Sequence, residues 1–105
     1  MRKRRYYIVS FYDKNDVQRD FDRIRTTSPS AVLHSYKVIM HDPVQNRIRK
    51  ELWNDTGVAY VACHDGVYSR TQNEFIKTTT EWIFRIDDFI KLCEKDVSYV
   101  SKTHR

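Results

Sequence analysis

The stretch RYYIVSFY, residues 5–12, decides the fold of this chain. Aromatic and β-branched residues of this kind favour a pleated strand. Alternate residues of a strand point to opposite faces, and here both faces are apolar. One face carries Tyr7, Val9 and Phe11, and the other carries Tyr6, Ile8 and Tyr12. The stretch therefore predicts a central strand, which is either covered on both faces or open on one face to a ligand.

The segment that follows this strand predicts a helix. Asp13 or Asn15 can supply the side-chain oxygen that caps its first turn. The apolar residues that recur at helical spacing are Val17, Phe21 and Ile24. Residues 26–30 end this helix, because a residue before proline avoids helical geometry. Residues 31–41 then alternate, with Val32, His34, Tyr36, Val38 and Met40 on the richer face, and predict a second strand.

Residues 42–53 allow two interpretations. Asp42 can cap a helix with Pro43 at its first position, and Val44, Ile48 and Leu52 recur every four residues. Alternatively, residues 42–46 form a hairpin loop and residues 47–53 form a strand. The helix is the favoured interpretation. A strand would align Arg47 and Arg49 on one face, whereas a helix spreads them around its axis.

The C-terminal half predicts strands, turns and a closing helix. We expect a turn at 54–57, a strand at 58–63, a tight turn at His64-Asp65-Gly66 and a return strand at 67–71. A further strand is expected at 77–86 and a helix from 88 to about 95. The predicted fold class is α+β: a single two-layer domain over residues 1–105, with a mixed sheet of about five strands and two or three helices. Residues 1–4, a basic leader, and the tail 99–105 are expected to be flexible.

Composition and charge indicate which kinds of partner and which cellular locations are expected. The net charge is +5, from 19 Lys and Arg against 14 Asp and Glu, which favours acidic partners such as nucleic acid. No segment approaches the length of a membrane span, and residues 6–12 are too short for a signal-peptide core. We therefore expect no membrane association and a cytoplasmic or nuclear location. Cys63 and Cys93 lie among apolar residues and are expected to be buried, reduced thiols.

Motifs of enzymes and cofactor sites do not occur in the sequence. With only two glycines there is no glycine-rich phosphate loop, and neither G-x-S-x-G nor H-E-x-x-H is found. His41-Asp42 and His64-Asp65 are interpreted as turn residues rather than metal ligands. Neither a cofactor nor a metal site is predicted. Asp13 is interpreted as a helix cap, or alternatively as a magnesium ligand of a nuclease.

The first residues combine positive charge with aromatic rings. Four consecutive basic residues precede the predicted strand, and they can either lie along phosphates or act as a solvated leader that protects the strand from aggregation. Tyr6, Tyr7 and Tyr12 can form a stacking platform for bases, or can lie at the edge of the core.

The leading hypothesis is a small, non-enzymatic module that binds nucleic acid through a basic and aromatic face. Its candidate residues are Arg2, Lys3, Arg4, Arg5, Tyr6, Arg19, Arg23, Arg47 and Arg49. One alternative is a protein-interaction module, such as a regulator or inhibitor, with Trp53 and Trp82 as interface anchors. A second alternative is a metal-dependent nuclease that uses Asp13.

Overall fold

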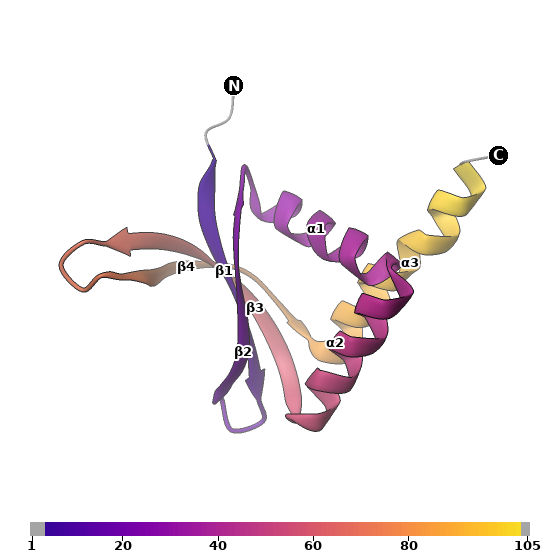
Figure 1. Ribbon diagram of the computed structural model, residues 1–105, viewed down its shortest axis with the longest axis horizontal. Helices are drawn as coiled ribbons and strands as arrows, with labels where there is room; N and C mark the ends of the chain where they lie inside the picture. Colours follow the sequence, from indigo (N-terminus) through magenta and orange to yellow (C-terminus); the bar gives the residue numbers. More distant parts are fainter. Residues whose placement is uncertain (1–3, 104–105) are drawn as a thin grey trace.

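The computed structural model describes residues 4–103, and the side chains of residues 4–95. Along the chain it contains strands β1 (Arg5–Asp13) and β2 (Gln18–Thr26), helices α1 (Pro29–His41) and α2 (Pro43–Asp55), strands β3 (Val58–Ser69) and β4 (Glu74–Arg85), and helix α3 (Ile86–Thr103). The strands form one antiparallel sheet in the order β2-β1-β3-β4. All three helices lie on one side of this sheet (Figure 1).

The core lies between the sheet and the helices. Phe11, fully buried on the central strand β1, stacks on Trp53 of α2 with ring centroids 4.8 Å apart. Burial of one such large apolar side chain contributes about 1.5–3 kcal/mol. The other buried apolar residues of this layer are Tyr7, Val9, Val32, Tyr36, Met40, Val58, Val61, Cys63, Phe89 and Cys93. The prediction that Trp53 anchors an interface is wrong, because its ring is part of the core.

The predicted two-layer α+β domain is confirmed. The sheet has four antiparallel strands rather than a mixed arrangement of about five, and there are three helices. β1 is a central strand, as predicted, with β2 on one side and β3 on the other. Helices α1 and α2 carry the chain from β2 across to β3, so no strand is needed in that connection.

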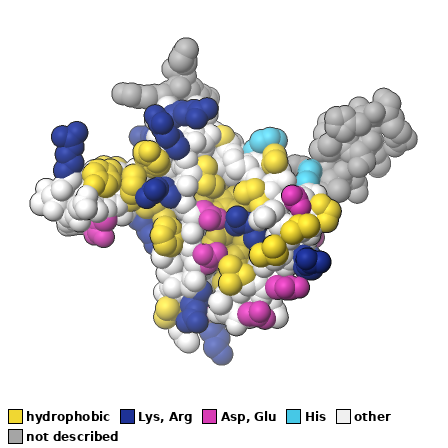
Figure 2. All heavy atoms as spheres, in the orientation of Figure 1, with side chains coloured by type: hydrophobic (Ala, Val, Ile, Leu, Met, Phe, Trp, Pro, Cys, Tyr) yellow, Lys and Arg dark blue, Asp and Glu magenta, His cyan; other side chains and the backbone are white. Residues whose placement is uncertain are grey.

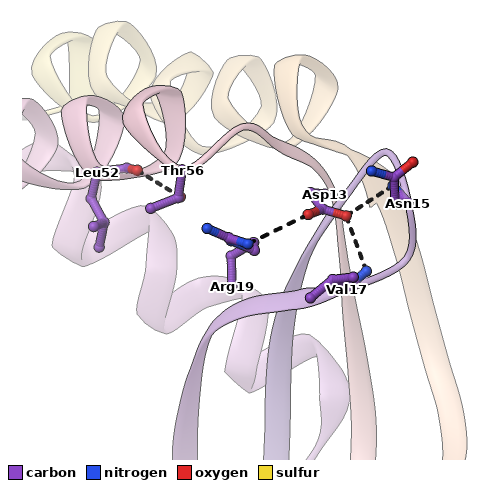
Figure 3. A network of polar contacts seen from close by, with 6 residues as sticks. All are labelled: Asp13, Asn15, Val17, Arg19, Leu52 and Thr56. Atoms are coloured by element: carbon purple, nitrogen blue, oxygen red, sulfur yellow. Dashed lines mark hydrogen bonds and ion pairs between the residues drawn. The ribbon is translucent and has the colours of Figure 1, made fainter.

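The prediction of a helix after Asp13 is wrong, because residues 18–26 form strand β2. The Asp13 carboxylate does cap backbone amides, but they belong to a hairpin turn. Its Oδ1 accepts hydrogen bonds from the amides of Asn15, at 2.8 Å, and Val17, at 3.0 Å (Figure 3). Asp16 adopts a positive φ of 63°, which aspartate tolerates better than most residues. The chain therefore reverses here, and β2 pairs with β1.

The prediction of a strand at 31–41 is also wrong, because these residues form α1. The Ser28 hydroxyl accepts a hydrogen bond from the Ala31 amide at 3.1 Å, and Pro29 occupies the first turn. The buried residues of α1 are Val32, Tyr36 and Met40. Residues spaced by four satisfy both the alternation of a strand and one face of a helix. The cap, rather than the apolar pattern, distinguishes the two.

The favoured helix at 43–53 is confirmed as α2. Asp42 caps it as predicted, since its Oδ1 accepts hydrogen bonds from the amides of Val44, at 2.9 Å, and Gln45, at 3.4 Å. The tight turn predicted at residues 64–66 is wrong, because β3 runs through it and β4 begins after a turn at 70–73. The pairing of β3 with β4 shifts its register on both sides of His64.

Gly66 lies in a strand, where the Ile8 side chain leaves little space for a Cβ atom. A Cβ atom there would lie 3.1 Å from Cγ1 of Ile8 on the neighbouring strand. Close approach of two strands, rather than a turn, therefore accounts for this glycine.

The remaining predictions concern the cysteines and the ends of the chain. Cys63 and Cys93 are both buried and form no disulfide, as predicted. Helix α3 begins near the predicted position and runs to Thr103. The predicted flexible tail lies partly within α3, and residues 1–3 of the predicted leader lie outside the described residues. Among residues 4–103, no helix is long and apolar enough to cross a membrane.

Candidate nucleic-acid interface

The helices cover only one face of the sheet, and the opposite face, called here the free face, carries aromatic and basic side chains. The strand register places these residues on it: Tyr6, Ile8, Ser10 and Tyr12 of β1; Gln18, Phe21, Arg23 and Arg25 of β2; Tyr60, Ala62, His64, Gly66 and Tyr68 of β3; and Phe75, Lys77, Thr80, Ile83 and Arg85 of β4. None of these residues is acidic. Figure 2 shows basic and hydrophobic side chains next to one another over the strands, at the left of the view.

Strand β2 separates its charges between the two faces of the sheet. Its odd-numbered residues from Arg19 to Arg25 are exposed, whereas the even-numbered ones are half-buried towards the helices. The exposed set is Arg19, Phe21, Arg23 and Arg25, and the half-buried set is Asp20, Asp22, Ile24 and Thr26. Because alternate residues of a strand face opposite ways, β2 presents its three arginines on the exposed side and its two aspartates towards the helices.

The arginines of β2 lie over aromatic rings. Cζ of Arg23 is 4.5 Å from the centroid of Phe75 and 6.0 Å from that of Tyr6, and Cζ of Arg25 is 5.8 Å from the Tyr6 centroid. Phe75 also contacts Tyr6 at 4.8 Å and Tyr68 at 5.1 Å between ring centroids. A planar guanidinium on a ring is held in place for contact with a phosphate or a base.

A second cluster lies at the other end of β1. The rings of Tyr12 and Tyr60 stack with centroids 4.9 Å apart. Lys77 Nζ donates to the Tyr12 hydroxyl at 3.1 Å and to Gln18 Oε1 at 2.5 Å. Lys77 comes from β4 and Gln18 from β2, which are the opposite edges of the sheet. The sheet is therefore curved so that its free face is concave, and the outer part of the β3–β4 hairpin bends away from the helices (Figure 1).

His64 lies between these clusters on β3. Its Nδ1 is 3.1 Å from the Thr80 hydroxyl, and its Nε2 is 3.5 Å from the hydroxyl of Tyr12. Partial burial lowers the pKa of His64 below its ordinary value of 6.5, and the nearby Lys77 ammonium lowers it further. The imidazole is therefore neutral at pH 7, and it becomes a further cation of the free face only in acid.

The hydroxyl of Tyr60 is held in its protonated form. Its pKa is raised to about 12, mainly by desolvation and then by the hydrogen bond that it donates to Asp16 at 2.8 Å. The ring next to Tyr12 is therefore a neutral phenol at every physiological pH, and it does not add a negative charge to the basic face.

The candidate residues predicted in the N-terminal half lie in different parts of the structure. Tyr6 and Arg23 meet on the free face. Arg19 lies at the end of β2 that follows the hairpin turn, with Nη1 3.8 Å from Asp13 Oδ2 (Figure 3). Arg5 points to the helix side, where its Nη1 is 3.8 Å from Asp65 Oδ2. Arg4 is exposed just before β1, and Arg2 and Lys3 lie outside the described residues.

Arg47 and Arg49 belong to α2, in the layer of helices, and are not brought onto the free face. Arg47 is exposed, whereas Arg49 Nη1 is 3.2 Å from Asp22 Oδ2, and the same carboxylate oxygen accepts a hydrogen bond from the Tyr36 hydroxyl. Arg49 thus joins α2 to the helix side of β2, and Tyr36 joins α1 to the same point. This arrangement assigns Arg49 a structural role.

Sequence reasoning missed several residues of the free face, namely Phe21, Arg25, Tyr60, His64, Phe75 and Lys77. The signal in β2 was the alternation of exposed arginines with Asp20, Asp22 and Ile24, which is a strand period. No local signal brings Lys77 and Phe75 to this surface, because they reach it through the pairing and curvature of the sheet.

The residues of the two alternative hypotheses lie elsewhere. Trp82 is half-buried, packs against the core and donates its Nε1 hydrogen to the Pro29 carbonyl at 3.1 Å. Both oxygens of Asp13 are engaged, by the turn amides and by Arg19. Among the residues that the structure describes, no three His, Cys, Asp or Glu side chains are grouped so that they could hold a metal ion.

No protein-family model, no curated protein and no solved structure matches this chain.

Proposed function

We propose that this protein is a non-enzymatic module that binds nucleic acid on the free face of its sheet. The observation that carries the proposal is the placement of Arg23 over the rings of Tyr6 and Phe75, and of Arg25 over the Tyr6 ring, on the free face of the sheet. Arginine and lysine neutralise phosphates, and exposed aromatic rings stack on bases. The free face offers both kinds of contact side by side.

The structure changes the set of residues in this proposal. Tyr6, Arg19 and Arg23 are kept, and Arg25 and Lys77 join them. Arg47 and Arg49 are left out because they lie in the layer of helices. Arg5 is left out because it faces the helix side and pairs with Asp65.

The residues on which the protein-interaction and nuclease alternatives were based have roles in the packing and turns of the fold. Trp53 lies within the core, Trp82 packs against it, and the Asp13 carboxylate stabilises a hairpin turn. Val44, Ile48 and Leu52 form an exposed apolar stripe on α2, but no feature of the described residues indicates what partner would cover it. We therefore propose neither alternative.

A salt series tests the proposed function. Fluorescence anisotropy measures the affinity of the protein for labelled single strands and duplexes of DNA and RNA at increasing salt. We expect affinity that falls as salt rises, with a slope that becomes shallower by about 0.7 for each phosphate contact removed on a single strand. Arg23→Ala is expected to weaken binding and to reduce this slope.

The matched control is Arg47→Ala, which removes an exposed arginine from the helix layer. It is expected to leave both the affinity and the salt slope unchanged. The proposal fails if the wild-type protein binds no nucleic acid at low salt, or if its affinity does not depend on salt. Equal effects of Arg23→Ala and Arg47→Ala would also contradict it.

A further inference from the structure

A hollow of about 480 Å³ opens on the free face where the bent β3–β4 hairpin faces β2. One wall comes from β1 and β2, and the other comes from the hairpin. The residues that line it are Ile8, Gln18, Phe21, Arg23, Tyr68, Asn73, Glu74, Phe75 and Lys77. Its volume lies within the range of about 300–1,000 Å³ that is usual for small-ligand sites.

The walls of the hollow are apolar and aromatic, and they remain partly exposed. Phe21 is 55% exposed and Tyr68 is 46% exposed, although both rings border a concave site. A single exposed apolar residue is ordinary in a protein, but two rings that face one hollow form a surface on which a flat apolar group can be held. The Tyr68 ring contacts that of Phe75, with centroids 5.1 Å apart, and its hydroxyl donates to Asn73, so the hairpin itself holds this ring on the wall of the hollow.

The charged side chains around the hollow indicate what kind of flat ligand it can bind. Arg23 and Lys77 border it with one carboxylate, Glu74, so cations are in excess and a ligand with a negative charge beside its ring is favoured. The amides of Gln18 and Asn73 and the carboxylate of Glu74 supply donors and acceptors for a polar edge. A nucleotide combines a flat base, a polar base edge and an adjacent phosphate, so it matches all three properties of the site.

The hollow is also expected to favour single strands over duplexes. In a duplex both faces of every internal base are covered by stacking, so no ring of the protein can reach them without unstacking. A single strand can turn one base out of its stack and into a pocket at a small cost.

We infer that this hollow receives one unstacked base of a single-stranded nucleic acid, with its flanking phosphates on Arg23 and Lys77. The inference rests on the proposed function and specifies its substrate class. The base lies between the ring of Phe21 on one wall and the rings of Tyr68 and Phe75 on the other.

The test uses single strands of about 12 nucleotides, in DNA and in RNA, and matched duplexes. Phe21→Ala is expected to weaken single-strand binding about tenfold, which corresponds to about 1.4 kcal/mol, through loss of base stacking. Tyr68→Ala removes a ring from the opposite wall and is expected to act in the same direction. Val38→Ala removes an exposed apolar side chain of α1 and is expected to have no effect.

A second measurement keeps the test independent of any one variant. A fluorescent base analogue, 2-aminopurine, is placed at each position of the strand in turn. Its emission is expected to change strongly at one position on binding, and Phe21→Ala is expected to reduce that change. Circular dichroism and thermal unfolding establish that each variant is folded.

The outcomes separate the inference from the proposed function. If the wild-type protein binds single strands but Phe21→Ala and Tyr68→Ala bind equally well, the hollow is not a base site while the proposed function stands. If the wild-type protein binds duplexes and single strands with equal affinity, the hollow is again not a base site and the proposed function stands. If the wild-type protein binds no nucleic acid, both fail. Binding of an acidic aromatic peptide in the hollow, with nucleic-acid binding unaffected by it, would also overturn the inference.

Discussion

Arg23 and Phe75 come from the two opposite edges of the sheet, yet the guanidinium carbon of Arg23 lies 4.5 Å from the centre of the Phe75 ring. β1 and β3 separate their strands, so the contact exists only because the sheet is curved towards its free face. The contact holds the guanidinium against a ring on a concave surface. The shape of the sheet and the chemistry of the candidate site are therefore linked at this pair.

Replacement of Arg23 by lysine separates the two roles of its side chain. Lysine keeps the positive charge, but it lacks the planar group that stacks on Phe75 and on a base. Arg23→Lys is therefore expected to weaken binding roughly threefold to tenfold without changing the slope of affinity against salt. Anisotropy titrations at several salt concentrations measure both quantities. A changed slope with an unchanged affinity at low salt would contradict this division of roles.

Arg49 is expected to contribute to stability and not to binding. Its Nη1 lies 3.2 Å from Asp22, in a site where both side chains are about one quarter to one third exposed. Loss of a partly screened ion pair of this kind costs about 1 kcal/mol. We expect Arg49→Ala to lower the free energy of unfolding in urea by that amount while the affinity for single strands is unchanged. A loss of affinity without a loss of stability would instead place Arg49 in the interface.

The sequence predicted the class of the fold and its central strand, but it assigned the wrong structure to two segments. In α1 the spacing of Val32, Tyr36 and Met40 fits a helix and a strand equally well, and the deciding feature was the cap at Ser28. Around β2 the helical spacing of Val17, Phe21 and Ile24 suggested the apolar face of a helix. Pairing with β1 overrides that local pattern, because a central strand as apolar as β1 must be covered by hydrogen-bonded neighbours on both sides.

The candidate site could be predicted only in part, because the pairing of strands brings some of its residues together. Tyr6 and Arg23 were identified from local charge and aromatic content, and they do lie together. Their neighbours Lys77 and Phe75 are more than fifty residues away in the sequence, so only the register of β3 and β4 brings them near. Arg25 was missed because a helix from Asn15 to Arg25 spreads its arginines around an axis, whereas a strand aligns them.

The thiol of Cys63 is expected to resist modification in the folded protein. Its pKa is raised to about 12, mainly by burial and to a smaller extent by the carboxylates of Glu81 and Asp65, so almost no thiolate is present near neutrality. Cys93 is also fully buried. Ellman's reagent is expected to react with neither thiol in the native protein and with both in concentrated urea. Rapid reaction of either thiol under native conditions would contradict the packing described for the core.

The last prediction concerns the effect of pH on stability through His64. Its pKa in the folded protein is lowered from 6.5 by burial and by Lys77, so between the folded value and 6.5 the unfolded chain binds more protons than the folded one. The free energy of unfolding should therefore be highest above pH 6.5 and should fall as the solution is acidified through this interval. Urea unfolding at about pH 7.5 and about pH 5.5 measures the loss.

His64→Gln serves as the control, because glutamine cannot gain the charge. Carboxylates elsewhere in the chain also affect stability in acid, so the test is the difference between the two proteins. The wild type is expected to lose more stability than His64→Gln over this interval. At the same time, protonated His64 adds a cation between Tyr12 and Thr80, so the affinity of the wild type for single strands should rise in acid relative to that of the variant. Parallel pH profiles of the two proteins would mean that His64 titrates as an ordinary exposed histidine, and that the free face does not hold it in the neutral form.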